Sequence, residues 1–554
     1  MIRPRSDWQR VAALVVCVAA VVSVAGCGAR ETRAGKASVE GVLLVGNGAE
    51  PQELDPHLVS GVPEHRLLSA LFEGLVDLDP ATLEPIPGAA ERWTVSPDGL
   101  VYTFYLRKDA RWSNGQPVTA QDFLYAWERI LTPTLASEYA SMLHCVVNAR
   151  AFNTGEIKDF SQVGVKALDD STIEVRLEQP TPYFLSLHVH YTWYPVPRKV
   201  IEALGGMTAR DTKWTQPEHM VSNGAFKLAQ WEPDKVIRVE KNPHYWNAAA
   251  VRLQAIAFYP IKDPMTEDRT FRTGGLHLTE NVPLPKIEMY QQEQFPFLHI
   301  DPYLGTYYYR MNTTKPPFDD ARVRRAFALS LDRDTLVAQV VDAGRQPAAH
   351  YVPPGTGGYT SNARMPYDVE QARRLLAEAG YPGGKGFPKV ELLYNTSDDH
   401  KRIAEAVQQM WNQALGVEVQ LLNQDWKVYL NSMNTLNYDI ARSGWIGDYS
   451  DPYNFLECFL SGNGNNRTGY ASEHYDRLVR KGASIMYKTG RLATYQQAED
   501  ILLADAPIIP VYFYTRPYLL SPDVKNWQPN HLGYISWKTL YGTADGTGPV
   551  APGA

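Results

Sequence analysis

Side chains that could bind a metal ion or act as an acid–base pair come close together at only a few points in the sequence. His188 and His190 are two residues apart, so an extended strand would place both on one face, as metal ligands require. No cysteine or acidic residue nearby completes such a site, and we predict no metal there. The acidic pairs Asp319-Asp320 and Asp398-Asp399 stand at the starts of predicted helices, where capping accounts for them.

The motifs of common enzyme classes are missing. The sequence contains neither HExxH nor GxSxG, the signatures of zinc peptidases and of nucleophile-elbow hydrolases. Residues 380–386, GYPGGKG, superficially resemble a phosphate loop, but Gly386 stands where Ser or Thr would hold magnesium. We interpret this stretch as a helix stop and turn. We predict a protein that is not an enzyme and needs no cofactor, with a secreted hydrolase as a remote alternative.

The N-terminus has the pattern of a secretory signal. Arginines precede the apolar run 11–24, which is too short to span a bilayer. The run leads into Val24-Ala25-Gly26-Cys27, which resembles the bacterial lipobox, whose cysteine is lipidated and becomes the mature N-terminus. An ordinary signal with a chance cysteine is the alternative. We predict that residues 1–26 are removed, that the lipid on Cys27 anchors the protein to a membrane, and that residues 27–40 form a tether.

The composition is that of a globular protein. Of 554 residues, 44% are hydrophobic and 21% charged, and the length suggests three or four domains. The net charge is −7, so the sequence has no excess of basic residues that would predict binding to nucleic acid. The 17 Phe, 13 Trp and 32 Tyr suit large cores and also binding sites with flat walls. Outside the signal only Cys145 and Cys458 remain, so disulfides do not hold the fold together.

Local patterns predict alternating helices and strands. Residues 100–106 are rich in β-formers whose alternate side chains share a face. A capped helix begins after Thr119, and two more are predicted over 368–380 and 397–416. Residues 417–421 alternate directly after the last helix, as a strand does. This order of elements favours an α/β fold.

Several long stretches resemble one protein family. From about residue 41 onward the chain is similar to the periplasmic oligopeptide-binding proteins, the family-five extracytoplasmic solute receptors of ABC importers. That family also includes murein-peptide, dipeptide and nickel receptors. The stretches that carry the resemblance are 48–75 (GAEPQELDPHLVSGVPEHRLLSALFEGL), 96–123 (SPDGLVYTFYLRKDARWSNGQPVTAQDF), 301–318 (DPYLGTYYYRMNTTKPPF), 392–402 (LLYNTSDDHKR) and 439–455 (DIARSGWIGDYSDPYNF).

The resemblance implies an α/β fold of two lobes that close around a buried ligand, with an additional third domain on one lobe. The strands that cross between the lobes near residues 305 and 512 would be the hinge, and closure would create the shape that the importer recognises. The implied divisions are lobe I over 41–72, 197–304 and 513–541, the extra domain over 73–196, lobe II over 305–512, and a disordered tail over 542–554.

The resemblance also implies where the two ends of a peptide bind. Asp448 takes the family position that anchors the peptide amine, which needs a fixed carboxylate because an unpaired buried charge is costly. Arg442 and His400 match family residues that meet the peptide carboxylate. His400 would lie in the first turn of a helix, where free N–H groups point outward.

Further family positions imply contacts with the peptide backbone and side chains. Strand-like recognition with roomy, hydrated pockets would accept many side chains. The matched backbone positions are Ser60, Gly61 and Val62 on one strand and Ser443, Gly444 and Trp445 on another. The matched aromatic pocket walls are Tyr139, Tyr303 and Trp426.

Some family features are lost. Met433 and Val341 replace two cations that meet the carboxylates of the shortest and of longer peptides. We therefore expect peptides of three to four residues to bind best. The disulfide of the best-known members falls on Gly305 and Ile446 and is absent.

We therefore predict an extracytoplasmic lipoprotein that captures short peptides and delivers them to the permease subunits of an ABC importer. The alternative within the family is a receptor for murein tripeptide or for a signalling peptide. Such a receptor binds a narrower range of ligands, which is compatible with loss of the two cations that meet the carboxylates of peptides of different length.

Overall fold

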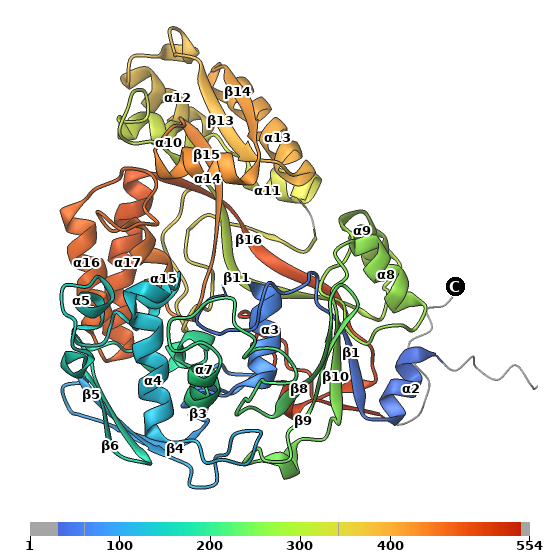
Figure 1. Cartoon of the computed structure of the whole chain (residues 1–554). Helices are drawn as coiled ribbons and strands as arrows, with labels where there is room; N and C mark the ends of the chain where they lie inside the picture. The colour runs from blue at the N-terminus through green and yellow to red at the C-terminus, as the bar shows by residue number, and fades with distance from the viewer. Residues whose placement is uncertain (1–31, 60, 342, 544–554) are drawn as a thin grey trace, which may run out of the picture.

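The computed structural model describes residues 32–59, 61–341 and 343–543. A narrow upper body stands on a broad lower body, and two long antiparallel strands run between them (Figure 1). These strands are β11, Leu298–Met311, and β16, Ile508–Leu519. The predicted two-lobe α/β architecture is confirmed.

The lower body contains a four-stranded sheet in the order β1-β10-β9-β8, with β1 parallel to β10. One face packs on α2, α8 and α9, and the other packs on α3. Strand β1 is buried along its whole length, as expected for a strand that is covered on both faces. The bounds are β1 Val42–Gly46, β8 Phe226–Glu232, β9 Val236–Lys241, β10 Ala255–Tyr259, α2 Arg33–Val39, α3 Val62–Leu71, α8 Pro264–Arg272 and α9 Leu284–Gln292.

The predicted tether, residues 27–40, is wrong from residue 33 onward, because Arg33–Val39 form helix α2. Ala34 is fully buried and Ala37 nearly so. These small side chains let α2 pack closely on β1, so the chain is part of the globule from this point. Several predictions lie outside the described residues: the signal peptide 1–26, Cys27, Ser60, and residues 544–554 of the tail.

A second, antiparallel sheet has the order β4-β5-β7-β6. Strand β5 buries alternate residues, as predicted. The capped start of α4 is also confirmed: the Thr119 N–H donates to Asp122 Oδ2 at 2.8 Å. The bounds are β4 Ala90–Val95, β5 Val101–Leu106, β6 Val165–Asp169, β7 Thr172–Arg176, α4 Ala120–Leu131, α5 Ala149–Asn153, α6 Phe184–Leu187 and α7 Arg198–Ala203.

The third sheet has the order β12-β16-β11-β15-β13-β14 and extends into the upper body. Its side chains alternate between two helical layers. Leu392 and Ile440 face α13, whereas Leu393 and Ala441 face α14. The bounds are β12 Gln346–Pro347, β13 Val390–Asn395, β14 Val419–Gln424, β15 Ile440–Ile446, α10 Ala321–Leu329, α11 Arg333–Leu336, α12 Val369–Glu378, α13 Asp398–Leu415 and α14 Trp426–Asn434.

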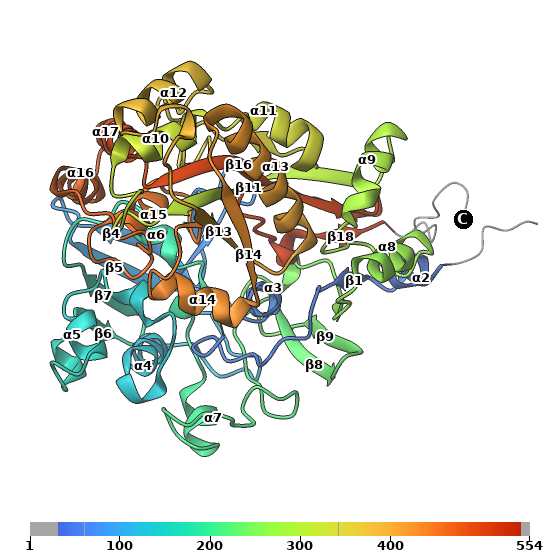
Figure 2. The same cartoon turned by 90° about the horizontal axis from the view of Figure 1, so that it is seen from above.

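The remaining helices pack beside the long strands on the side away from α8 and α9 (Figures 1 and 2). They are α15 Tyr453–Leu456, α16 Glu473–Ser484 and α17 Lys488–Asp505. Two small hairpins are β2 Val76–Leu78 with β3 Pro85–Pro87, and β17 Val524–Lys525 with β18 Tyr541–Gly542. The short helical turns are η1 Pro133–Leu135, η2 Ala140–Leu143, η3 Phe160–Gln162, η4 Tyr191–Trp193, η5 Ala248–Ala250, the π-helical η6 Val337–Val341, η7 Pro382–Gly384, η8 Glu457–Phe459 and η9 Trp537–Thr539.

Candidate functional site

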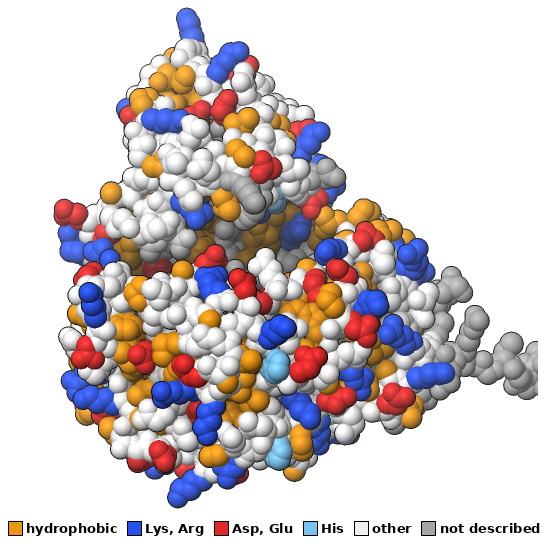
Figure 3. Space-filling view, viewed as in Figure 1, with side chains coloured by type: hydrophobic (Ala, Val, Ile, Leu, Met, Phe, Trp, Pro, Cys, Tyr) orange, Lys and Arg blue, Asp and Glu red, His pale blue; other side chains and the backbone are white. Residues whose placement is uncertain are grey.

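A cavity of about 520 Å³ lies where α3 and its neighbours meet the loop that follows β15. Figure 3 shows the molecule hollowed between its two bodies, with hydrophobic side chains at the back of the hollow. The cavity lining comes from segments that are far apart in the sequence, including 446–450 and 514–517. Of the predicted site residues, those that line the cavity are Gly61, Val62, Tyr139, Tyr303 and Asp448.

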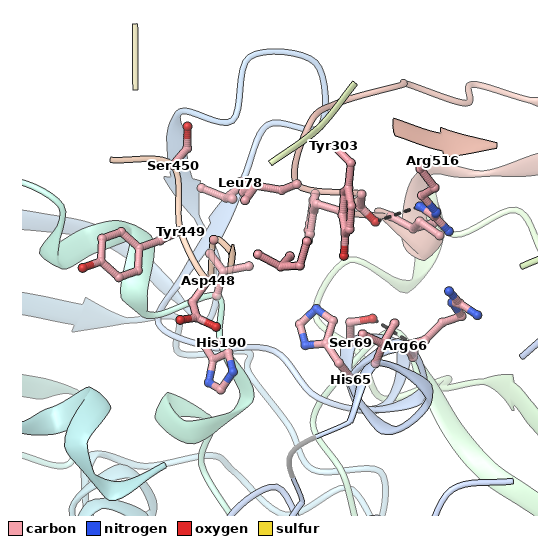
Figure 4. A pocket seen from close by; sticks show the side chains of 18 of the residues that line it. His65, Arg66, Ser69, Leu78, His190, Tyr303, Asp448, Tyr449, Ser450 and Arg516 are labelled. Carbon is pink, nitrogen blue, oxygen red and sulfur yellow. Dashed lines mark hydrogen bonds between the residues drawn. The ribbon is translucent and has the colours of Figure 1, made fainter. Parts of the chain in front are cut away.

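Asp448 lies two residues beyond β15, and its side chain reaches the cavity (Figure 4). Asn454 holds this turn, because its Oδ1 accepts the Asp448 backbone N–H at 3.2 Å and Trp445 Nε1 at 3.0 Å. The Asp448 carboxylate is accessible from the cavity but surrounded by protein. This desolvation raises the pKa of its carboxyl to about 6, and a 3.5 Å hydrogen bond from Asn454 Nδ2 opposes the rise.

Aromatic rings close the cavity beside Asp448. The ring centroids of Tyr139 and His190 are 5.3 Å apart, and those of His190 and Tyr191 are 4.0 Å apart. Burial lowers the pKa of His190 to about 3, with a further contribution from His65, so the imidazole is neutral. Among the described residues, no Lys, Arg or His lies within 4.0 Å ion-pair distance of the Asp448 carboxylate. The cavity therefore presents a negative charge that a ligand ammonium could neutralise.

His188 and His190 do not lie on a strand. His188 follows α6, and His190 precedes η4. His188 is fully buried, with ring centroids 5.1 Å from Phe104 and 4.5 Å from Trp193, so it belongs to the aromatic core. Within the described part of the chain, no group of three or more His, Cys, Asp or Glu could hold a metal ion.

Arg442 lies on β15, on the face that α13 covers. Its Nη1 donates to Asn395 Oδ1 at 3.1 Å, and its Nη2 donates to the Tyr514 hydroxyl at 3.2 Å. Its guanidinium lies 5.0 Å from the ring centroid of Tyr307. No carboxylate of the described residues forms an ion pair with it. Since Tyr514 lines the cavity, Arg442 supplies an uncompensated positive charge directly behind the cavity wall.

His400 lies in the first turn of α13, which Ser397 caps and Gly416 ends, as predicted. Its ring centroid is 5.7 Å from that of Tyr307, so His400 lies near Arg442. Burial, followed by the charges of Arg442 and Arg345, lowers the pKa of His400 to about 3. His400 is therefore a neutral imidazole that can form a hydrogen bond.

The backbone between Arg442 and Asp448 has an open edge. One edge of β15 pairs with β11 along its whole length. The other edge pairs with β13 only at Ile440 and Ala441. From Ser443 onward, no described strand pairs with that edge, so an extended ligand could add to the sheet there.

The predicted residues on this strand have distinct roles. Ser443 is buried, and its hydroxyl accepts Arg310 Nε at 3.0 Å. A Cβ atom at Gly444 would come within 2.7 Å of the Tyr514 hydroxyl, so glycine permits this close approach. Trp445 is tied to the Asp448 turn through Asn454. Trp426 begins α14, but its side chain lies outside the described residues.

An ion cluster on the cavity wall beside α3 was not predicted from the sequence. Arg66 Nη2 donates to Glu280 Oε2, and Arg516 Nη2 donates to the same oxygen at 3.4 Å. All three residues line the cavity. Their sequence separation is large, and only the fold brings them together.

Comparison with known proteins agrees with this geometry. The family model described as "Bacterial extracellular solute-binding proteins, family 5 Middle" matches residues 84–467. The periplasmic oligopeptide-binding protein OppA of Escherichia coli is 41% identical over 497 residues, covering 87% of this chain and 89% of OppA.

Solved structures agree as well. MppA, a periplasmic murein-tripeptide-binding protein, matches in its unliganded open form with a TM-score of 0.78 and 35% identity, covering 91% of this chain and 97% of MppA. OppA of Haemophilus influenzae in complex with RPPGFSPFR matches with a TM-score of 0.74 and 37% identity, covering 91% of this chain and 99% of the other.

None of the helices in the described residues is long and apolar enough to cross a membrane.

Proposed function

We propose that this chain, which belongs to family 5 of the bacterial extracellular solute-binding proteins, captures short oligopeptides outside the cytoplasm and delivers them to an ABC importer. The observation that carries the proposal is the open edge of β15, with Arg442 at one end and Asp448 beyond the other. A ligand would therefore meet, in order, the negative Asp448 carboxylate, the unpaired backbone groups of β15 and the positive Arg442 guanidinium. A zwitterionic extended peptide requires groups in this order.

In this proposal the peptide amine binds to Asp448, and the peptide backbone pairs with β15 from Ser443 onward. The carboxylate binds to Arg442, while the neutral His400 and the free N–H groups at the start of α13 supply hydrogen bonds. Closure of the two lobes about β11 and β16 would bury the ligand. We also propose the division of the chain into lobe I, extra domain and lobe II at the bounds given above. The side-chain pockets belong to the same proposal.

Peptides of three to four residues are the proposed ligands. Shorter peptides would lack a cation for their carboxylate, because the position that would supply it is Met433. This side chain is buried in the core between α14 and the sheet. Each added residue moves the carboxylate about 3.3 Å further from the amine in an extended peptide. The lipid on Cys27 is proposed to hold the receptor at the membrane near the permease.

A murein-tripeptide receptor is the second candidate, because MppA in its unliganded open form is among the matching structures. Mass spectrometry of peptides that copurify with the protein would separate the two. A varied set of linear peptides favours the general receptor, whereas a single branched or D-residue peptide favours the second candidate.

Calorimetry tests the function itself. We expect trialanine to bind the chain that lacks residues 1–26, and N-acetyl-trialanine to bind at least tenfold more weakly because it has no ammonium for Asp448. If neither trialanine nor any member of a mixed peptide library binds, the proposal is wrong.

A further inference from the structure

Two arginines flank a stacked pair of tyrosines at the carboxylate end of the proposed site. The rings of Tyr307 and Tyr512 stack with centroids 4.7 Å apart. Arg442 lies 5.0 Å from the centroid of Tyr307, and Arg345 lies 5.2 Å from that of Tyr512. Both arginines act on His400, whose pKa they help to lower. Arg345 therefore belongs to the same group of side chains, although neither the sequence nor the family resemblance assigned it a role.

The backbone is shaped to place Arg345 there. Ala343 and Gly344 adopt left-handed conformations with φ of 60° and 70°, which reverses the chain after η6. Thr515 of β16 fixes the turn, because its hydroxyl donates to the Ala343 carbonyl at 2.8 Å. Arg345 Nη1 then donates to the carbonyl of Val341 at 3.1 Å. The side chain is thus held against the hinge strand and is only half buried.

The charges in this group are not balanced. Neither Arg345 nor Arg442 forms an ion pair with any carboxylate of the described residues. Both guanidinium charges act on His400, and the neutral imidazole adds no compensating negative charge. Three buried nitrogen atoms of this group lack a hydrogen-bond partner: Arg345 Nε, Arg442 Nε and His400 Nδ1. Buried polar atoms are usually hydrogen-bonded, so these nitrogen atoms are available to a ligand.

We propose that Arg345 is a second anion-binding residue of this site, so that the protein prefers ligands with two carboxylates at the C-terminal end. A peptide whose last residue is Asp or Glu has this chemistry: its α-carboxylate meets Arg442, and its side-chain carboxylate meets Arg345. The inference rests on the proposed peptide-binding function. It adds a specificity for charge that the backbone contacts of β15 do not provide.

The test compares matched peptides that differ only in this charge. Dissociation constants of Ala-Ala-Glu and Ala-Ala-Gln, and of Ala-Ala-Ala-Glu and Ala-Ala-Ala-Gln, are measured by calorimetry at low salt. We expect the native protein to favour the Glu peptide by tenfold or more in at least one pair. In Arg345→Gln this ratio should fall to about twofold or less, and in Arg345→Lys, which retains the charge, most of it should remain.

Arg374→Gln is the matched control, because Arg374 is exposed on α12 in the upper body and its loss changes the net charge equally. In Arg374→Gln the ratio of the dissociation constants of the Gln and Glu peptides should equal that of the native protein. Thermal unfolding of Arg345→Gln is compared with the native protein, and the ratio is read only from folded protein.

The inference is overturned if the native protein binds the Glu and Gln peptides equally at both lengths. It is also overturned if Arg345→Gln keeps the full preference, or if Arg374→Gln loses it to the same extent. Failure of the native protein to bind any of the four peptides would instead contradict the proposed function.

Discussion

Tyr183 and Tyr449 stack face to face, with ring centroids 4.7 Å apart and an interplanar angle of 12°. Tyr183 comes from the segment before α6, whereas Tyr449 directly follows Asp448. Tyr453 stacks on Tyr183 as well, at 5.2 Å. The turn that carries the proposed amine anchor is therefore held from outside by a ring of the lower body.

Replacing Tyr183 by Ala should weaken peptide binding. Aromatic pairs contribute about 0.5–1.5 kcal/mol beyond their buried area, so loss of the stack should raise the dissociation constant of a tripeptide up to about tenfold. Tyr183→Phe keeps the ring and should bind nearly as the native protein does. Calorimetry on both variants checks this. Equal affinity in Tyr183→Ala and Tyr183→Phe would show that the stack does not position Asp448.

Asp448→Asn should weaken tripeptide binding by at least about 2 kcal/mol, roughly thirtyfold, because the ammonium would lose its counter-charge. The measurement is calorimetry with trialanine and N-acetyl-trialanine. The acetylated peptide has no ammonium, so its already weak binding should change little between native and variant. An unchanged affinity for trialanine would contradict the assignment of Asp448 as the residue that binds the peptide amine.

Peptide affinity should decrease below about pH 6. The pKa of the free Asp448 carboxyl is about 6, and a bound ammonium would lower it by favouring the ionised form. Binding at lower pH must therefore release a proton, and affinity should fall by up to about tenfold per pH unit. Dissociation constants between pH 5 and 8 check this, with Asp448→Asn as the control whose profile should be flat over the same range.

Arg442 and His400 should affect peptides of different length. With the amine fixed at Asp448, Arg442→Ala should weaken tripeptides and tetrapeptides, whereas His400→Ala should weaken mainly tetrapeptides. Dipeptides should bind poorly even to the native protein. A series of alanine peptides of two to five residues provides the measurement. Equal losses at every length, or tight binding of dialanine to the native protein, would show that the site reads peptide ends differently.

Cys27→Ser should release the mature protein from the membrane without unfolding it, since the predicted lipid has no other attachment point. Cell fractionation followed by circular dichroism of the soluble protein is the measurement. A variant that still partitions into the membrane fraction would contradict the lipid anchor.

Features that depend on neighbouring residues were predicted well from the sequence. The start of α4 at Thr119 and both ends of α13 were correct, because a cap forms within one helical turn. The surroundings of His190 could not be predicted from the local pattern, since they include the ring of Tyr139 from a distant segment. Helix α2 was also missed, because its packing on β1 could not be read from a short stretch of small residues.

The candidate site could be predicted only in part. Residues in the 439–455 stretch were located by family resemblance, and the structure brings Asp448 to the cavity. The neutrality of His400 depends on burial and on two nearby arginines, and the proposed role of Arg345 depends on a turn held by Thr515. Such relationships between segments that are far apart in sequence become visible only in the folded chain.

Gly305 and Ile446, the two positions to which the family resemblance assigns a disulfide, are paired across β11 and β15. The Ile446 side chain fills the space beside Gly305, where an added Cβ would lie 2.4 Å from Ile446 Cδ1. A hydrocarbon contact thus links the two strands at the position where the resemblance implies a disulfide. In the described residues both cysteines, Cys145 and Cys458, are free. This fold should therefore assemble without an oxidising partner, and reductants such as dithiothreitol should leave its melting temperature unchanged.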